Sequence, residues 1–512
     1  MRSSFAGSSK RVVAATIAAM AVPACGAHSA SPPPIMPDIA LLNRVTWGAT
    51  ESSVAQLRSM GWERWLDWQL HPAESDRLPL AAQEQIDALA ISQQPMPALV
   101  ADLAARAKAA NQIADPAEKQ SARRAHQQAL TDLSRQAATR QILRDLYAPP
   151  QLREQMTWFW FNHFNLHQYK SDIRAMVGDY EDRAIRPHAL GRFRDLLAAT
   201  VRHPAMLRYL DNADNAAGHI NENYAREIME LHTMGVGSGY TQHDVEELAR
   251  CLTGLGIDRR PEGPRLRPDL QSQLVRNGLF EFNPARHDYG DKVFLGQTIK
   301  GRGLAELDEV IDILSRQPAT ARHISQQLAI FFVADTPPPA LVERMAQAFL
   351  QSDGDIATVL RTMFHAPEFA TSADSKFKDP VHFVLSAVRL AYGDKVILNT
   401  APIQGWLNRM AEGLYNHETP DGYSMLSTAW NGPGQLAVRF EIARQIGSGS
   451  AGMFKPAQPG AVDHPAFPQL QNALFFDGLR HALSPRTRAA LDQAISPQDW
   501  NFLFLSSPEF MY

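Results

Sequence analysis

The sequence predicts a mainly α-helical protein, with a multi-helix globular body, a protruding long helical pair and one small β-hairpin. Three observations support this fold class. Apolar residues recur with helical spacing from Asp38 to the C-terminus, alternating runs typical of strands are rare, and Gly and Pro separate the helical segments. The chain has 512 residues, of which 45% are hydrophobic and 20% are charged, so it is large enough to bury a core without disulfides or metals.

The first 37 residues are predicted to precede the folded part of the chain. A short basic region is followed by an apolar run from Val12 to Ala24, which is typical of a secretory signal and assigns residues 1–24 to a signal peptide. This run is too short to cross a hydrocarbon core of about 30 Å. Residues 25–37, which contain three consecutive prolines, are predicted to form a Pro-rich spacer.

Two routes of export remain open. Val22-Pro-Ala-Cys25 resembles the lipobox of bacterial lipoproteins, apart from its Pro, and would place a lipid on Cys25. Cleavage near Ala27 or Ala30 would instead release the chain without a lipid. We therefore expect an exported protein, which is either periplasmic, attached to the outer membrane as a lipoprotein, or secreted. A lipid on Cys25 is the only membrane contact that the sequence predicts.

Residues 38–512 are predicted to form a single large helical domain. Residues 97–146 are rich in Ala, Gln and Arg and are interrupted at Asp115-Pro116, which predicts an antiparallel helical pair that protrudes as an arm. The aromatic run Trp158–Phe164 has apolar residues on every side, so its helix is expected in the middle of the fold. Residues 279–299 predict the β-hairpin, and residues 376–512 predict a C-terminal helical lobe.

Charge and motif content exclude several classes of protein. The 50 Lys and Arg residues against 54 Asp and Glu residues give a net charge of −4, and no basic stripe is present, so we expect no nucleic-acid partner. The sequence lacks the His-Glu-x-x-His, Cys-x-x-Cys, Walker A and Gly-x-Ser-x-Gly motifs. The two cysteines, Cys25 and Cys251, cannot form a disulfide framework.

Seven blocks of sequence resemble those of a known family. They are Leu41–Thr50, Trp160–Phe164, Ile185–Gly191, Asn221–Gly235, Gly239–Arg250, Lys376–Pro380 and Trp430–Gly434. On these blocks the chain resembles the bacterial family called domain of unknown function 1800, over nearly the whole mature chain. The resemblance implies a large, mostly helical and often exported bacterial protein, and it implies no established reaction. Phe161 departs from the family pattern, in which a second His often precedes Asn162.

A metal site is one hypothesis for the buried polar residues. On a helical wheel, His163 and His167 lie about 40° apart on one face of the aromatic helix, a spacing that suits two ligands of a divalent metal such as zinc. A third ligand must come from another segment, and Glu227 borders the apolar face of the helix that begins near Asn221. The alternative is that each His is a core residue bonded to a backbone carbonyl.

Four further residues complete this candidate site: Asn162, Asn223, Arg226 and His232. On the wheel, His232 points away from Glu227, so their helix alone cannot bring both side chains to one metal. The alternative interpretation of the acids on this helix is a solvated ion pair between Arg226 and Glu230, four residues apart.

His287 and Asp288 are the candidate acid–base pair. They lie in the loop of the predicted hairpin, where an Asp can orient a neighbouring imidazole as a general base or a metal ligand. The alternative is an ordinary pair of turn residues.

Two functions follow from these residues. The first is an exported metal-dependent hydrolase, in which His163, His167 and Glu227 bind the metal and His287 with Asp288 serves as acid and base. The second is a non-catalytic envelope binding or scaffold protein. Its helical arm and its aromatic loops, Thr419–Tyr423 and Trp430–Gly434, would bind a partner protein or a polymer.

Overall fold

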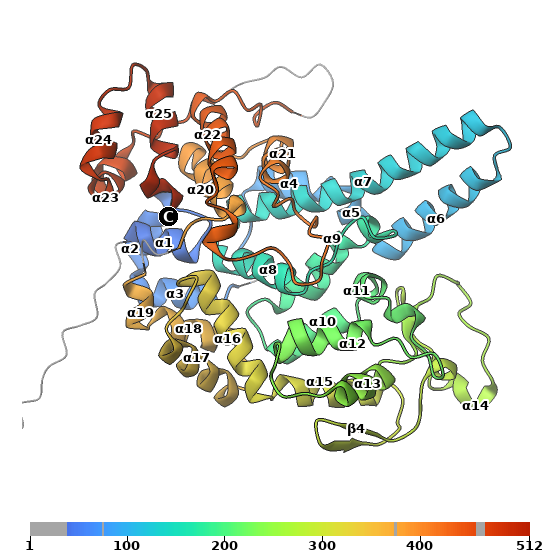
Figure 1. Ribbon diagram of the computed structural model, residues 1–512. Coiled ribbons are helices and arrows are strands. Elements are labelled where there is room, and N and C mark those ends of the chain that lie inside the picture. Colours follow the sequence, from blue (N-terminus) through green and yellow to red (C-terminus); the bar gives the residue numbers. More distant parts are fainter. Residues whose placement is uncertain (1–37, 74–75, 373–375, 457–465) are drawn as a thin grey trace, which may run out of the picture.

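The helices of this protein surround a central helix, α8 (Gln151–His163), which lies in the middle of the molecule (Figure 1). The computed structural model describes residues 38–73, 76–372, 376–456 and 466–512. The predicted signal peptide and the Pro-rich spacer lie outside the described residues. The predicted fold class, a mainly helical body with a protruding helical pair, is confirmed.

Helix α8 is buried along most of its length, and its second half, Trp158–Phe161, carries aromatic rings on every side. Eleven of its thirteen residues are buried, and the indole of Trp160 donates a hydrogen bond to the carbonyl of Ala189 over 2.9 Å. The one acid that the helix buries, Glu154, receives two hydrogen bonds from the Arg186 guanidinium, at 2.6 and 2.9 Å. A buried carboxylate needs such a partner, because desolvation without one costs several kcal/mol.

The N-terminal helices lead into the arm. Helices α6 and α7 run antiparallel and project away from the body, so that the outer half of α7 is largely exposed (Figure 1). Asp115 caps α7 by accepting a hydrogen bond from the Glu118 amide, and Pro116 occupies the first helical position, where a proline is tolerated. The elements of this part are α1 (Asp38–Val45), α2 (Glu51–Met60), α3 (Trp62–Leu70), α4 (Leu80–Asp87), α5 (Ala90–Gln93), α6 (Met96–Gln112) and α7 (Pro116–Tyr147).

The chain between α8 and the strands consists of short helices, several with 3₁₀ or π geometry. Two π-helical turns, η2 (Tyr180–Ile185) and η5 (Ile228–Thr233), follow directly on short α-helices. The other elements are η1 (Ile173–Ala175), α9 (Val177–Asp179), η3 (Arg186–His188), α10 (Phe193–Val201), α11 (Pro204–Tyr209), η4 (Asn212–Asp214), α12 (Asn223–Glu227) and α13 (Gln242–Cys251), and α14 (Pro268–Gln271) follows the first strand.

The strands of the described residues form two small antiparallel sheets, which corrects the prediction of a single hairpin over residues 279–299. One sheet has the order β1 (Leu255–Ile257), β3 (Phe280–Phe282), β2 (Val275–Asn277), and the other pairs β4 (Lys292–Phe294) with β5 (Gln297–Ile299). Pro284 explains the difference, because it has no amide hydrogen to continue β3 and begins the 3₁₀ turn η6 (Pro284–Arg286). Leu295 and Gly296 close the second sheet with two positive φ angles, 47° and 74°, as a tight hairpin requires.

The C-terminal part returns to helices, and two of them, α20 and α22, lie beside each other near α7 (Figure 1). Its elements are α15 (Ala305–Ser315), α16 (Pro318–Phe332), α17 (Pro339–Gln351), α18 (Ile356–Phe364), α19 (Pro367–Ala370), α20 (Pro380–Tyr392), α21 (Ala401–Arg409), η7 (Ser427–Ala429), α22 (Pro433–Ser448), η8 (Phe475–Leu479), α23 (Arg480–Ala482), α24 (Pro485–Leu491), α25 (Pro497–Leu505) and η9 (Pro508–Met511).

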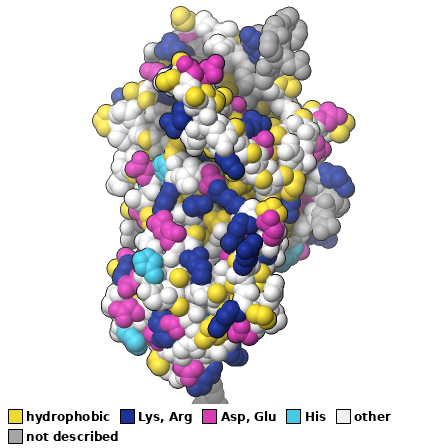
Figure 2. Space-filling model, turned by 90° about the vertical axis from the view of Figure 1, so that its right-hand side faces the viewer, with side chains coloured by type: hydrophobic (Ala, Val, Ile, Leu, Met, Phe, Trp, Pro, Cys, Tyr) yellow, Lys and Arg dark blue, Asp and Glu magenta, His cyan; other side chains and the backbone are white. Residues whose placement is uncertain are grey.

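Acidic and basic side chains are mixed over the face of the molecule that looks along the arm (Figure 2). This distribution agrees with the near-neutral net charge of the chain. Within the part of the chain that the structure describes, no helix combines the length and the apolar character that a membrane span requires.

We expect Thr241→Ala to lower the free energy of unfolding by about 1 kcal/mol, because Thr241 caps helix α13. Its hydroxyl accepts the Asp244 amide over 3.2 Å, and the Asp244 carboxylate accepts the Thr241 amide over 2.8 Å. Urea denaturation measures the loss. Thr362→Ala is the matched control, since the Thr362 hydroxyl donates only to the carbonyl of Thr358, one turn earlier on the exposed side of the same helix. Equal stability of the two variants would contradict a capping role.

Candidate functional site

The two imidazoles predicted to share one helix face do not lie on one helix. Helix α8 ends at His163, and Phe164 closes it with a hydrogen bond to the carbonyl of Trp160. Asn165 then donates its side-chain amide to the carbonyls of His417 and Thr419, at 3.2 and 2.7 Å. These tertiary hydrogen bonds replace another helical turn, so His167 leaves the helix and the predicted ligand spacing is wrong.

His163 is held by aromatic contacts and one hydrogen bond. Its ring lies 4.7 Å from Phe164 and 5.5 Å from Trp160, centroid to centroid, and its Nε2 is 3.1 Å from the carbonyl oxygen of His232. Burial, together with the neighbouring His323, lowers the pKa of His163 to about 3. The ring is therefore neutral near pH 7, donates from Nε2, and keeps Nδ1 as a hydrogen-bond acceptor.

The other members of the predicted site lie on α12 and η5. Burial, with added repulsion from Glu230 and Asp421, raises the pKa of the Glu227 carboxyl. Asn223 donates its side-chain amide to the carbonyl of Leu210. Arg226 pairs with Glu222 over 3.0 Å. This corrects the predicted ion pair between Arg226 and Glu230, because the acid that Arg226 binds lies one helical turn earlier in the chain.

His232 is buried against Phe164, with ring centroids 5.0 Å apart, and its two ring nitrogens have no hydrogen-bond partner among the described residues. Burial lowers its pKa well below the ordinary value, with His163 as the next contribution, so the ring stays neutral. The described residues include no group of three or more His, Cys, Asp and Glu that could hold a metal ion. The predicted ligand set of His163, His167 and Glu227 is therefore not assembled, and the metal-dependent hydrolase has no support.

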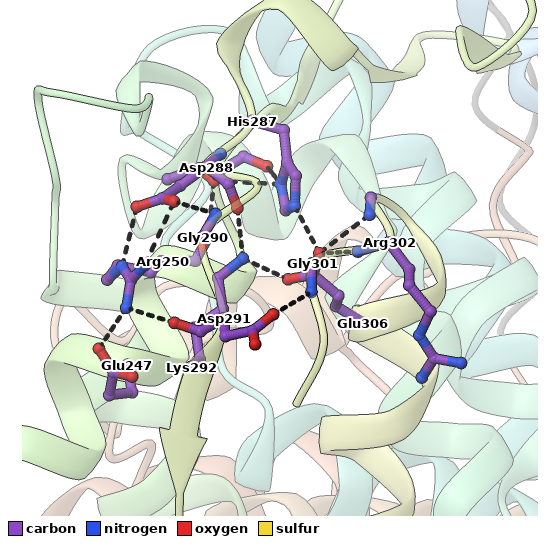
Figure 3. A network of polar contacts seen from close by, with 12 residues as sticks. Glu247, Arg250, His287, Asp288, Gly290, Asp291, Lys292, Gly301, Arg302 and Glu306 are labelled. Carbon is purple, nitrogen blue, oxygen red and sulfur yellow. Dashed lines mark hydrogen bonds and ion pairs between the residues drawn. The ribbon is translucent and has the colours of Figure 1, made fainter. Parts of the chain in front are cut away.

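His287 and Asp288 belong to a network of polar contacts around the second sheet (Figure 3). His287 Nε2 lies 3.0 Å from a carboxylate oxygen of Glu306, and its Nδ1 lies 2.9 Å from the carbonyl oxygen of Thr253. Lys292 donates to the second carboxylate oxygen of Glu306. The side chains of His287, Lys292 and Glu306 are all completely buried.

Asp288 is engaged in the same network, because it accepts two hydrogen bonds from the Arg250 guanidinium at 2.8 and 3.2 Å. Arg250 in turn binds Glu247 over 2.7 Å (Figure 3). His287 and Asp288 therefore do not face one another as an acid–base pair; each holds a different partner. The interpretation as catalytic residues is replaced by a structural one, in which they fasten the loop to α13 and α15. Glu306 was missed by the sequence analysis, although an acid at the start of an apolar helix could have indicated it.

A cavity of about 350 Å³ lies where α8 ends, and it brings together motifs that are far apart in sequence. Asn162 holds the loop Thr419–Tyr423 with two hydrogen bonds. Its side-chain amide donates to the carbonyl of Tyr423 over 2.9 Å, and its side-chain oxygen accepts a hydrogen bond from the Tyr423 amide over 2.7 Å. His163, His417 and Asp421 also line this cavity. The ring of Tyr423 stacks on Trp158 and contacts His417, so the aromatic loop does line a cleft.

A larger groove of about 970 Å³ lies at the base of the arm, between α7 and α21. Its polar lining consists mainly of amides and hydroxyls, among them Thr131, Ser134, Thr139, Gln168, Gln404 and Asn408. Arg135 is the one charged residue among the described residues that line it. No local pattern in the sequence indicates this groove, because its residues are scattered from Gln85 to Pro456 and form no motif.

The polar side chains of the groove are partly organised by one another. The hydroxyls of Thr139 and Thr400 lie 2.9 Å apart, and the Gln404 amide donates to both, at 3.1 and 3.0 Å. Tyr169 stands at the groove with 53% of its surface exposed, which is high for a large aromatic residue. The groove therefore offers fixed neutral hydrogen-bonding groups and one accessible aromatic ring.

Comparison with known proteins identifies a family. No curated protein and no solved structure gives a significant match to the chain. A family model described as "Protein of unknown function (DUF1800)" matches residues 40–512, nearly the whole chain. The blocks that meet around α8 and its cavity, including Trp160–Phe164, all fall within this match. The chain therefore belongs to the DUF1800 family.

Proposed function

We propose that this protein is an exported binding protein of the cell envelope, and that it holds a neutral, hydroxyl-rich chain in the groove at the base of its arm. The segment Val12–Ala24, with its preceding basic residues, supports export. A stretch of an oligosaccharide is the ligand class that fits the groove best. The single observation that carries the proposal is a large groove whose described polar lining consists of amides and hydroxyls with one charged residue.

The lining favours a neutral ligand over an ion. A charged ligand would lose its hydration in the groove without gaining an ionic partner from most of the wall, and this exchange is unfavourable. Hydroxyl groups, in contrast, both donate and accept, which matches side chains such as Thr139, Gln404 and Asn408. The exposed ring of Tyr169 adds an apolar surface of the kind that aromatic residues supply at binding sites.

The size of the groove indicates an extended ligand. Its volume of about 970 Å³ is at the upper end of the range for small-molecule sites, roughly 300–1,000 Å³. The walls come from α7, the main helix of the arm, and from α21 in the C-terminal part. A polymer that passes through the groove would thus contact both α7 and α21. The arm contributes to binding through the face of α7 that lines the groove.

We expect Gly405→Gln to weaken the binding of a neutral tetrasaccharide by about tenfold or more, because the new side chain fills the groove. Gly405 lines the groove on α21, and a Cβ atom there meets nothing within 4 Å, so the substitution does not disturb the fold. Titration calorimetry of the purified full chain with tetramers of N-acetylglucosamine and of glucose measures the affinity.

Gly434→Gln is the matched control, because Gly434 is also an exposed glycine with open space around it, on α22. This variant should bind like the unaltered chain. Binding that is unchanged in Gly405→Gln, or a failure of both tetramers to bind, would contradict the proposal.

A further inference from the structure

A second cavity lies at the opposite end of the molecule from the arm, beside α1 and the C-terminal end of the chain. Its volume is about 770 Å³, and its wall includes Arg44, Lys376, Lys378, His382 and Leu479. A narrow apolar pocket of about 50 Å³ adjoins it and reaches Leu390, Leu483 and Phe504. Lys378 and Glu509 line both spaces, together with the apolar residues Ile39 and Leu479, so the two spaces meet beside Lys378.

Lys378 is a buried cation without an acidic partner among the described residues. Only 8% of the residue is exposed, and its ammonium donates to the carbonyl of Phe510 over 2.6 Å. It also lies 4.0 Å from the centre of the Phe510 ring, in a cation–π contact. The charged groups that act on it most are Arg439 and Arg44, which are cations themselves, and burial together with their repulsion lowers the pKa of Lys378 to about 7.

The acids of the cavity wall are already engaged elsewhere or exposed. Asp38 pairs with Arg58 over 2.9 Å, and Asp379 accepts the amide and the imidazole of His382. Glu509 accepts hydrogen bonds from the Ser484 amide and the Thr487 hydroxyl. Asp477 lies on the exposed rim.

The other lysine of the wall, Lys376, is neutralised by Asp335 over 2.7 Å. Of the two lysines in the wall, Lys378 is therefore the one that has no acidic partner among the described residues. A buried ammonium without a counter-charge is unfavourable, and a bound anion would relieve it.

We infer that this cavity binds a small amphiphilic carboxylate, whose head group pairs with Lys378. Its apolar chain lies along Ile39 and Leu479 of the cavity wall, and the end of the chain reaches the narrow pocket lined by Leu390, Leu483 and Phe504. A monoanion matches the single charge of one buried ammonium. The adjoining apolar pocket selects a carboxylate with an aliphatic chain over a small polar one. This site is separate from the groove at the base of the arm, and neither proposal depends on the other.

Binding of octanoate to the full chain tests this inference by calorimetry, with octanol and inorganic phosphate as comparison ligands. We expect octanoate to bind about tenfold more tightly than octanol, and Lys378→Met to remove that preference by weakening octanoate about tenfold. Met keeps an unbranched side chain of similar length without the charge. Lys395→Met is the matched control, because Lys395 also lies over a phenylalanine ring, that of Phe454 at 4.6 Å, but on the exposed surface.

A measurement on the unaltered chain keeps the test independent of how the variant folds. Reductive methylation followed by peptide mass spectrometry reports whether the Lys378 amine can be reached from the cavity. We expect Lys378 to be methylated in the free protein. Octanoate, but not octanol, should reduce this methylation, and neither compound should change the methylation of Lys395. Tighter binding of phosphate than of octanoate, equal protection by octanol, or a Lys378 that is never methylated would each overturn the inference.

Discussion

Replacing Glu306 by Ala is expected to lower the free energy of unfolding by about 3–5 kcal/mol, the largest effect among the substitutions considered. The Glu306 carboxylate holds His287 and Lys292 in a region where all three side chains are fully buried. It also accepts the backbone amides of Arg302 and Gly303, at 2.6 and 2.9 Å. Removing the acid leaves the buried Lys292 ammonium without a counter-charge, with only the carbonyl of Asp288 as an acceptor, and leaves the buried amide of Gly303 unpaired.

Glu309→Ala on the same helix is the control for Glu306→Ala. Glu309 forms an ion pair with Arg302 at the surface, and exposed pairs of this kind contribute about 1 kcal/mol or less. Urea denaturation of both variants gives the two free energies of unfolding. If the two losses were similar, the network of Figure 3 would not stabilise this part of the fold.

The effect of Glu306→Ala should depend on pH in a defined direction. Burial raises the pKa of Glu306, but the hydrogen bonds from His287 and Lys292 outweigh it, and the pKa of the folded state lies below the ordinary value. A depressed pKa stabilises the folded state above the unfolded pKa, near 4.3, and this contribution disappears as the pH falls through the folded value. The difference in the free energy of unfolding between the unaltered chain and Glu306→Ala should therefore be largest near pH 7 and should shrink below about pH 4.

Gly422→Ala is expected to lower the free energy of unfolding by about 3 kcal/mol and to release the loop Thr419–Tyr423 from the end of α8. Gly422 has φ +72°, a conformation that residues with a Cβ rarely adopt. A Cβ atom at this position would also lie 2.1 Å from the carbonyl oxygen of Asn162. The substitution thus adds a steric clash to backbone strain at the point where Asn162 grips Tyr423.

Gly237→Ala separates these two causes. Gly237 has nearly the same φ, +71°, but a Cβ atom there meets nothing within 4 Å, so we expect a loss of about 1 kcal/mol from strain alone. Thermal and urea unfolding measure the stability of both variants. Equal losses in the two variants would show that the contact with Asn162 does not hold the loop.

Local sequence determined the helical elements of this protein and the ends of many of them. Helical composition and the Asp115-Pro116 break predicted the arm, because these signals act within a few residues of chain. The burial of the second half of α8 was also predictable, since the aromatic run Trp158–Phe161 places large apolar rings on every side of the helix. The family membership likewise comes from the sequence alone.

Tertiary contacts decided where the candidate residues lie. Helix α8 stops at His163 because Asn165 bonds the distant carbonyls of His417 and Thr419, and no residue near His163 in sequence signals this end. His287 is held by Glu306, nineteen residues away, and the groove collects side chains from five separate segments of the chain, between Gln85 and Pro456. Periodicity predicts which face of a helix is buried, but which side chains meet depends on long-range packing, and only the folded structure contains that information.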